Sequence, residues 1–365
     1  MIQERLDSIL TRSGNKVGEA LETIDRCRTR YGFYASADRY KHEYWTRDLY
    51  YSLDTLLSLG YHDEVKNQIE EIWGKQKPDG NVPRLAIKHP IMRALNKIYN
   101  KIRNGELIHS LRALGTLETR VNSWTIDYVP MAVLSAYIYA KKSGDFSLVE
   151  KLKPQIAKAI SYIEQHMSGG LLIGGDWRDS LPWLRDKALL SNNAILYKMY
   201  SDTGEKEKAE RLKKRINEVF WNGEYYMDFE GSRNFDPLGA SLAIIEGIVP
   251  ESRYAALSKK LESASRKSGV LSMVEENPVS GSDRDYTQSC NQRYAVWPFI
   301  SLLAVQALKK AGADNTAVRE LDKFNRLKGF YEWYDPDTGK PRGSKKQLWS
   351  AAAYYSAAKR LYKTK

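Results

Sequence analysis

Two acidic clusters in the sequence carry the residue types that acid–base chemistry needs. In the first, 169–183 (GGLLIGGDWRDSLPW), Asp176 and Asp179 stand three residues apart with Trp177 and Arg178 between them. A carboxyl group beside indole rings is partly desolvated, which raises its pKa and keeps a proton available near neutral pH. This segment therefore holds the strongest candidates for a general acid, and Asp176 and Asp179 remain alternatives. Surface carboxylates in a turn are the other interpretation.

The second cluster surrounds Glu332, which lies between Tyr331 and Trp333 ahead of a DPDTG turn. Glu is a poor turn residue and has no capping role at this position, which favours a functional role over a simple exposed side chain. One protonated and one ionised carboxyl group are the pair that glycosidic-bond hydrolysis requires. A separation of about 6.5–9.5 Å would predict inversion of the anomeric centre, and about 5–5.5 Å retention.

Two further polar clusters stand where helices are expected to begin. Arg47 and Asp48 follow Thr46, so they form either a capping ion pair or a donor and acceptor set for two adjacent sugar hydroxyls. Asp127 lies in the first turn of another predicted helix, where capping alone explains it. Capping does not explain Trp124 in the same segment.

The tryptophans are concentrated in the connections before predicted buried helices or in the first turns of those helices. Seven of the nine lie there: Trp45, Trp124, Trp177, Trp183, Trp297, Trp333 and Trp349. Aromatic faces stack on sugar rings while Asp, Asn and Arg bond the hydroxyls, so this composition suits a carbohydrate. Some of these rings could instead serve only to fill the core.

Helical periodicity dominates the elements that must position these residues. Six segments are apolar over most of their circumference and alternate with six that carry a charged face, which predicts an inner and an outer ring of helices. The inner set is 46–60, 126–143, 187–203, 237–247, 293–311 and 347–363; the outer set is 17–30, 62–74, 146–166, 204–219, 250–266 and 314–326. The predicted fold is all-α, an (α/α)6 toroid.

The connections between these helices are unequal in length. The long ones, notably 75–125, 167–186, 267–292 and 327–346, all precede inner helices, so we expect a single mouth with long loops at one end of the barrel. We expect one domain over 1–365, with 88–120 inserted as a basic, lid-like segment. A little β structure is predicted at 221–230, where aromatic residues flank an Asn-Gly turn.

Composition excludes some classes of protein. With 42% hydrophobic and 28% charged residues the chain is neither wholly disordered nor a disulfide-stapled miniprotein. The net charge of +12 is spread along the chain. Cys27 and Cys290 form no metal-binding motif, and we expect neither metal nor cofactor. Without an N-terminal apolar run or a membrane-spanning stretch, a cytoplasmic protein is expected, with no membrane or nucleic-acid partner.

Five motifs together resemble the (α/α)6-toroid glycoside hydrolases. They are YWTRD (44–48), NSWTIDYVP (122–130), DWRDS (176–180), NQRYAVWPF (291–299) and EWYDPDTGKPRG with LWSAAAY (332–354). The similar families are the amylo-α-1,6-glucosidase part of glycogen-debranching enzyme, processing α-glucosidase, neutral trehalase, alkaline/neutral invertase and mannosylglycerate hydrolase. The resemblance covers most of the chain. The lettering around the acid differs from that of invertases and trehalases, so it does not carry over a substrate.

This resemblance implies an inverting hydrolase with an Asp acid and a Glu base. Its register places the acid on Asp179, although Asp176 on the same loop stays an alternative, and Glu332 matches the base. Arg47 and Asp48 would match residues that hold hydroxyls of the nonreducing sugar. The full set of expected sugar contacts is Tyr44, Trp45, Arg47, Asp48, Trp124, Asp127, Trp177, Arg178, Gln292, Trp297, Trp333, Lys345 and Trp349.

The leading hypothesis is an exo-acting, α-glucosidase-like enzyme acting on a short oligosaccharide or small glycoside. One alternative is a sugar epimerase on the same barrel, which needs histidines at the mouth. Only His42 and His89 are expected near it. The other alternative is a basic helical protein that binds nucleic acid, which would leave Asp179, Glu332 and the tryptophans unexplained.

Overall fold

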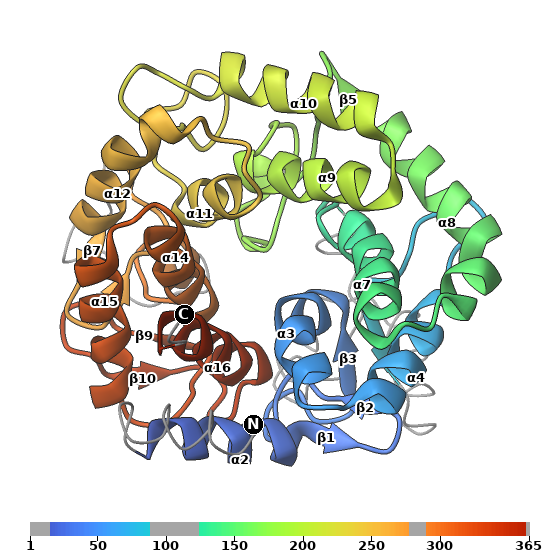
Figure 1. The fold of residues 1–365 in the computed structure, drawn as a ribbon, viewed down its shortest axis with the longest axis horizontal. Coiled ribbons are helices and arrows are strands. Elements are labelled where there is room, and N and C mark those ends of the chain that lie inside the picture. The colour runs from blue at the N-terminus through green and yellow to red at the C-terminus, as the bar shows by residue number, and fades with distance from the viewer. Residues whose placement is uncertain (1–14, 88–123, 277–289, 363–365) are drawn as a thin grey trace, which may run out of the picture.

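The computed structural model describes residues 15–87, 124–276 and 290–362, and these form two concentric rings of helices (Figure 1). All twelve predicted helices are present. The inner ring consists of α3 (Thr46–Ser58), α7 (Tyr128–Ser143), α9 (Leu190–Thr203), α11 (Pro237–Ile245), α14 (Pro298–Lys310) and α16 (Leu348–Tyr362). The outer ring consists of α2 (Lys16–Cys27), α4 (His62–Trp73), α8 (Ser147–Gln165), α10 (Lys206–Val219), α12 (Tyr254–Ser263) and α15 (Asp314–Arg326).

Contacts between neighbouring helices close the inner ring. α3 packs on α7, α7 on α9, α9 on α11, α11 on α14, α14 on α16, and α16 returns to α3 and α2. Burial follows the predicted difference between the rings. In α11 every residue from Pro237 to Ile244 is buried, whereas α10 buries only the stripe Ala209, Leu212, Ile216 and Val219. The (α/α)6 toroid is therefore confirmed.

Several helix boundaries differ from the predicted ones. α14 begins at Pro298 instead of residue 293, because proline suits the first turn of a helix and the short α13 (Cys290–Arg293) precedes it. α9 begins at Leu190 instead of residue 187, because Ala188 and Leu189 form β-bridges with residues of other segments. These residues belong to the loops that line the predicted mouth.

Short two-stranded antiparallel sheets complete the connections. They pair β1 (Arg28–Thr29) with β2 (Gly32–Phe33), β3 (Glu43–Trp45) with β4 (Leu85–Ile87), β5 (Met167–Ser168) with β6 (Leu171–Leu172), β7 (Ser265–Arg266) with β8 (Gly269–Val270), and β9 (Trp333–Tyr334) with β10 (Pro341–Arg342). The β structure predicted at 221–230 is a single bridge between Trp221 and Tyr226, together with bridges to other segments. The lid-like segment 88–120 lies outside the described residues.

The barrel also has a pocket toward the end where the inner helices terminate. This pocket of about 210 Å³ is partly open to solvent and carries charged residues from the C-terminal halves of five inner helices or just beyond them. There Asp54 is paired with Lys142, and Lys198 lies 3.3 Å from Glu246. The axis of the barrel is therefore also hollow toward the end away from the long loops.

Within the described ranges, no helix is long and apolar enough to cross a membrane. Nor does this part of the chain bring three or more His, Cys, Asp or Glu side chains together as a metal site.

Candidate active site

Asp179 lies on the long loop before α9, and three side chains from other segments surround its carboxylate. Nε2 of Gln292 donates a hydrogen bond to Oδ1 at 3.1 Å. Nη1 of Arg84 and Nη1 of Arg47 lie 3.5 and 3.6 Å from Oδ2. The side chain keeps 19% exposure. It is thus fixed by polar partners yet open to a ligand, and its nearest polar neighbours are guanidinium and amide groups instead of the predicted indoles.

Glu332 lies just before β9, with its carboxylate held from two sides. The hydroxyl of Tyr40 donates to Oε1 at 2.8 Å, and the backbone N–H of Ser344 donates to Oε2 at 3.0 Å. Nη1 of Arg39 lies 3.8 Å from Oε2. Burial raises the pKa of Glu332 even though these three groups favour the ionised form, and the charge of Asp179 raises it further. A buried carboxylate with a raised pKa is a stronger base than an exposed one.

Asp48 adds a third carboxyl group to the site from the first turn of α3. It is buried and accepts a hydrogen bond of 2.8 Å from Nε2 of Gln347. Burial and the nearby charge of Glu332 raise its pKa well above the usual range. The protonation of Asp48 therefore depends on the charge of Glu332, because interacting carboxyl groups do not ionise independently.

Arg47 and Asp127 form a buried bidentate pair between the starts of α3 and α7. Nε and Nη2 of Arg47 donate to the two carboxylate oxygens of Asp127, each at 2.7 Å. Nη2 also donates to the backbone carbonyl of Asp176 at 3.1 Å. The guanidinium thus joins two inner helices to the loop of Asp179, and only Nη1 faces that carboxylate.

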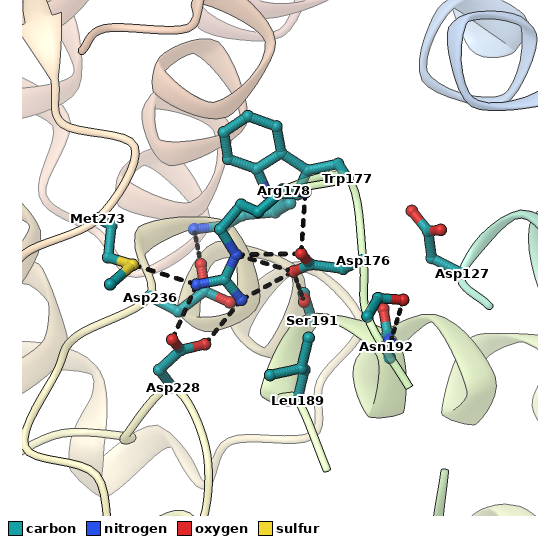
Figure 2. Close-up of polar contacts among 12 residues, drawn as sticks. Asp127, Asp176, Trp177, Arg178, Leu189, Ser191, Asn192, Asp228, Asp236 and Met273 are labelled. Carbon is teal, nitrogen blue, oxygen red and sulfur yellow. Dashed lines mark hydrogen bonds and ion pairs between the residues drawn. The ribbon is translucent and has the colours of Figure 1, made fainter. Parts of the chain in front are cut away.

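Asp176 and Arg178 lie in a separate buried network (Figure 2). The guanidinium of Arg178 is fully buried between Asp176 and Asp228, with five donor–acceptor distances of 2.8–3.2 Å. Burial would raise the pKa of Asp176, but the charge and hydrogen bonds of Arg178 lower it. Nearby Asp236 caps α11 through Leu238, and burial raises its pKa to about 7. The predicted sugar contact of Arg178 and acid role of Asp176 do not fit this burial.

Aromatic side chains from three inner helices and the Asp179 loop form one cluster. Trp177 lies 5.1 Å from Trp297, and Phe299 stacks on Trp349 at 4.3 Å between ring centroids. Tyr51 contacts both Phe299 and Trp349. The Nε1 atoms of Trp177 and Trp349 and the hydroxyl of Tyr51 are buried without a hydrogen-bond partner in the described part of the chain. Such donors are costly unless they are satisfied, and ligand hydroxyls could satisfy them.

The other predicted contacts occupy varied positions. Nε1 of Trp45 donates to Glu43, and its ring lies beneath the guanidinium of Arg84. Tyr44 is buried and bonds Thr29. Trp124 packs against the backbone of Gly175, Trp333 is buried, and Lys345 is exposed.

Sequence reasoning missed several polar partners of the site. They are Arg39, Tyr40, Arg84, Gln347, Asp228 and Asp236. For most of these no local motif signals a role, because each side chain acquires its partner only when distant segments meet. Asp236 is an exception, since Asp followed by Pro is a recognisable helix start.

Comparisons with known proteins agree with this architecture. The Mannosylglycerate hydrolase MGH1-like glycoside hydrolase domain matches residues 184–350. A mannosylglycerate hydrolase from Rubrobacter radiotolerans is 30% identical over 159 residues, which cover 40% of this chain and only about a third of that protein (35%).

Two solved structures share the whole fold. A GH63 mannosylglycerate hydrolase from Thermus thermophilus, in complex with glucose, has a TM-score of 0.68 at 14% identity and covers 93% of this chain and 99% of its own. A wild-type glycosidase has a TM-score of 0.64 at 16% identity, with 96% and 97% covered. The family model and the curated relative confirm the predicted resemblance to the (α/α)6-toroid glycoside hydrolases, and the solved structures share the fold.

Proposed function

We propose that the protein is an inverting, exo-acting glycoside hydrolase with Asp179 as general acid and Glu332 as general base. The observation that carries this proposal is the meeting of two carboxylates from separate loops beside an aromatic cluster with three unpartnered donors. Asp179 is the acid in preference to Asp176, because Asp179 is partly exposed whereas Asp176 is fully paired inside the protein.

In the proposed reaction each carboxyl group moves one proton. Asp179 gives its proton to the glycosidic oxygen as the bond to the anomeric carbon breaks, and Glu332 takes a proton from the attacking water. The hydroxyl of Tyr40 and the backbone N–H of Ser344 orient the base. Gln292 orients the acid.

The substrate class we propose is a short oligosaccharide or small α-glycoside. Trp177, Trp349 and Tyr51 each have a donor without a partner among the described residues, which suits hydroxyl-rich ligands, and the indoles offer apolar faces for a sugar ring. Arg84 and Arg47 near Asp179 would favour a leaving group with a carboxylate, as mannosylglycerate has. The MGH1-like domain match supports that choice.

No specific observation favours the two alternative functions. Among the described histidines, His42 contacts Tyr34 and His166 bonds the carbonyl of Tyr162. A nucleic-acid role would leave the buried carboxylates unused. A cytoplasmic location is proposed from the buried free thiol of Cys27 and the lack of a cysteine motif.

The test is sugar release from mannosylglycerate, trehalose, sucrose and a panel of α-linked disaccharides by the wild type, Glu332→Gln and Asp179→Asn. We expect hydrolysis of at least one substrate by the wild type and a loss of at least about 10²-fold in each variant. Proton NMR of the first anomer formed checks inversion. A wild type that is inert on the panel but binds nucleic acid with a steep salt dependence would refute the proposal.

A further inference from the structure

The segment Asp176–Asp179 directs alternate side chains to different surroundings. Asp176 and Arg178 lie in the buried network, whereas Trp177 joins the aromatic cluster and Asp179 meets Arg84 and Gln292. Figure 2 shows the ring of Trp177 apart from the carboxylates that surround Arg178. Trp177 and Asp179, which face the proposed sugar, are therefore positioned by the buried residues Asp176 and Arg178 that alternate with them.

We propose that Arg178 is a positioning residue that fixes the general acid in register with the glycosidic oxygen. This inference rests on the proposed function, because it assumes that Asp179 protonates the leaving group. Arg178 itself has 0% exposure and touches no solvent-accessible surface where a substrate could bind. Its effect on the reaction would therefore pass through the backbone of the next residue.

The contacts of Arg178 hold this backbone from two sides. Nε and Nη2 donate to Asp176, which also accepts the backbone N–H of Arg178 at 3.0 Å. Nη1 and Nη2 each donate to Asp228 at 2.8 Å. A guanidinium can bond two carboxylates in this way because its donors form a rigid planar fork, and a lysine ammonium cannot.

Both acidic residues are anchored to the N-terminus of α9. Oδ2 of Asp176 accepts a hydrogen bond of 2.8 Å from the hydroxyl of Ser191 in the first turn of α9. The backbone carbonyl of Asp228 accepts the N–H of Leu190 at 2.9 Å. Arg178 therefore ties the loop of the acid to the N-terminus of α9.

This anchoring matters because proton transfer depends strongly on position. A displacement of about 1 Å at a reacting group can cost roughly 10²-fold in rate. The loss would depend on the leaving group, since a poor one needs protonation and fluoride needs much less. A merely structural role of Arg178 would instead reduce the amount of active enzyme equally for every substrate.

The experiment compares Arg178→Lys with wild type on two substrates that release the same sugar. One is the best substrate of the panel above, and the other is the α-glycosyl fluoride of its sugar. We expect kcat on the former to fall by about 10²-fold, kcat on the fluoride to fall by less than about 10-fold, and KM to change little. Asp179→Asn should show the same selective loss.

The matched control is Arg253→Lys. Nη1 of Arg253 bonds Oδ1 of Asn217 and the hydroxyl of Tyr226, at 2.8 and 2.7 Å, in contacts away from Asp179 and Glu332. Arg253→Lys should lower the melting temperature without changing the ratio of the kcat values on the two substrates. Asp228→Asn provides a second test if Arg178→Lys does not fold, because it keeps the shape of the network and weakens one side of it. It should change the ratio in the same direction.

The outcomes separate this inference from the proposed function. Equal losses on both substrates for Arg178→Lys and Asp228→Asn would overturn the positioning role while the hydrolase stands. A wild type inert on both substrates would overturn the hydrolase, and the inference with it.

Discussion

Gly343 lies so close to Glu332, the proposed base, that a side chain at residue 343 would clash with it. Its φ is +70°, and a Cβ built there would lie 2.4 Å from Oε2 and 2.7 Å from Cβ of Glu332. Ordinary van der Waals contacts of a Cβ begin near 3.4 Å, so Gly343→Ala would displace the carboxylate by about 1 Å. The positive φ adds strain of about 1–2 kcal/mol for a residue with a side chain.

We expect Gly343→Ala to lower kcat by roughly 10²-fold, equivalent to about 2.7 kcal/mol of activation free energy. The backbone strain should also lower the melting temperature by a few degrees. Both are measured on purified protein, by steady-state hydrolysis of the best panel substrate and by thermal unfolding.

Gly339→Ala in the same connection is the matched control. Its φ is +75°, but a Cβ there meets only Cδ2 of Leu327 at 3.4 Å, away from Glu332. It should show the same loss of stability with nearly full activity. If Gly343→Ala keeps the kcat of Gly339→Ala, the geometry of Glu332 does not limit the reaction and the reasoning is refuted.

The remaining predictions concern charge and stability. The base must be ionised, so activity is lost as pH falls through the raised pKa of Glu332. Because the charge of Arg39 lowers that pKa, Arg39→Gln should move the acid limb of the kcat/KM profile to higher pH. An acid limb that does not move would contradict the assignment of Glu332 as base. Burial raises the pKa of Asp236 to about 7, so this carboxyl lowers stability as pH rises from about 4 to 7. Asp236→Asn should therefore gain stability relative to wild type across that window in urea unfolding, and a constant difference would argue against the shift. Asp127→Ala removes the bidentate partner of the buried Arg47, which should cost about 3–5 kcal/mol, while the double change Arg47→Met/Asp127→Leu should recover much of it.

The ring of helices was predictable because its signal is local. The apolar circumference of α11 and the single stripe of α10 are visible in the sequence without any tertiary information. The boundaries near Leu190 and Pro298 were less predictable, because β-bridges and loop contacts from other segments decide where these helices start.

The candidate site was predictable in its types of residue and not in their orientation. Asp179 and Glu332 stand out by their unusual neighbours in the sequence. Arg178 looks equally suitable for binding a sugar, yet its partner Asp228 lies fifty residues away and turns it inward. Only the folded chain shows which side chains of a loop face a ligand and which face the protein.

Closure of the ring by α16 on α2 and α3 has a consequence for biosynthesis. The ribosome releases α16 after every other described helix. The faces of α3 and α14 that contact α16 therefore stay uncovered until α16 has been synthesised. Contacts between elements about 300 residues apart also raise the contact order, which slows folding. The nascent barrel therefore passes through an open, aggregation-prone arc. Chaperone dependence during synthesis should exceed that of a helical solenoid of equal length, in which each repeat packs only on its neighbours.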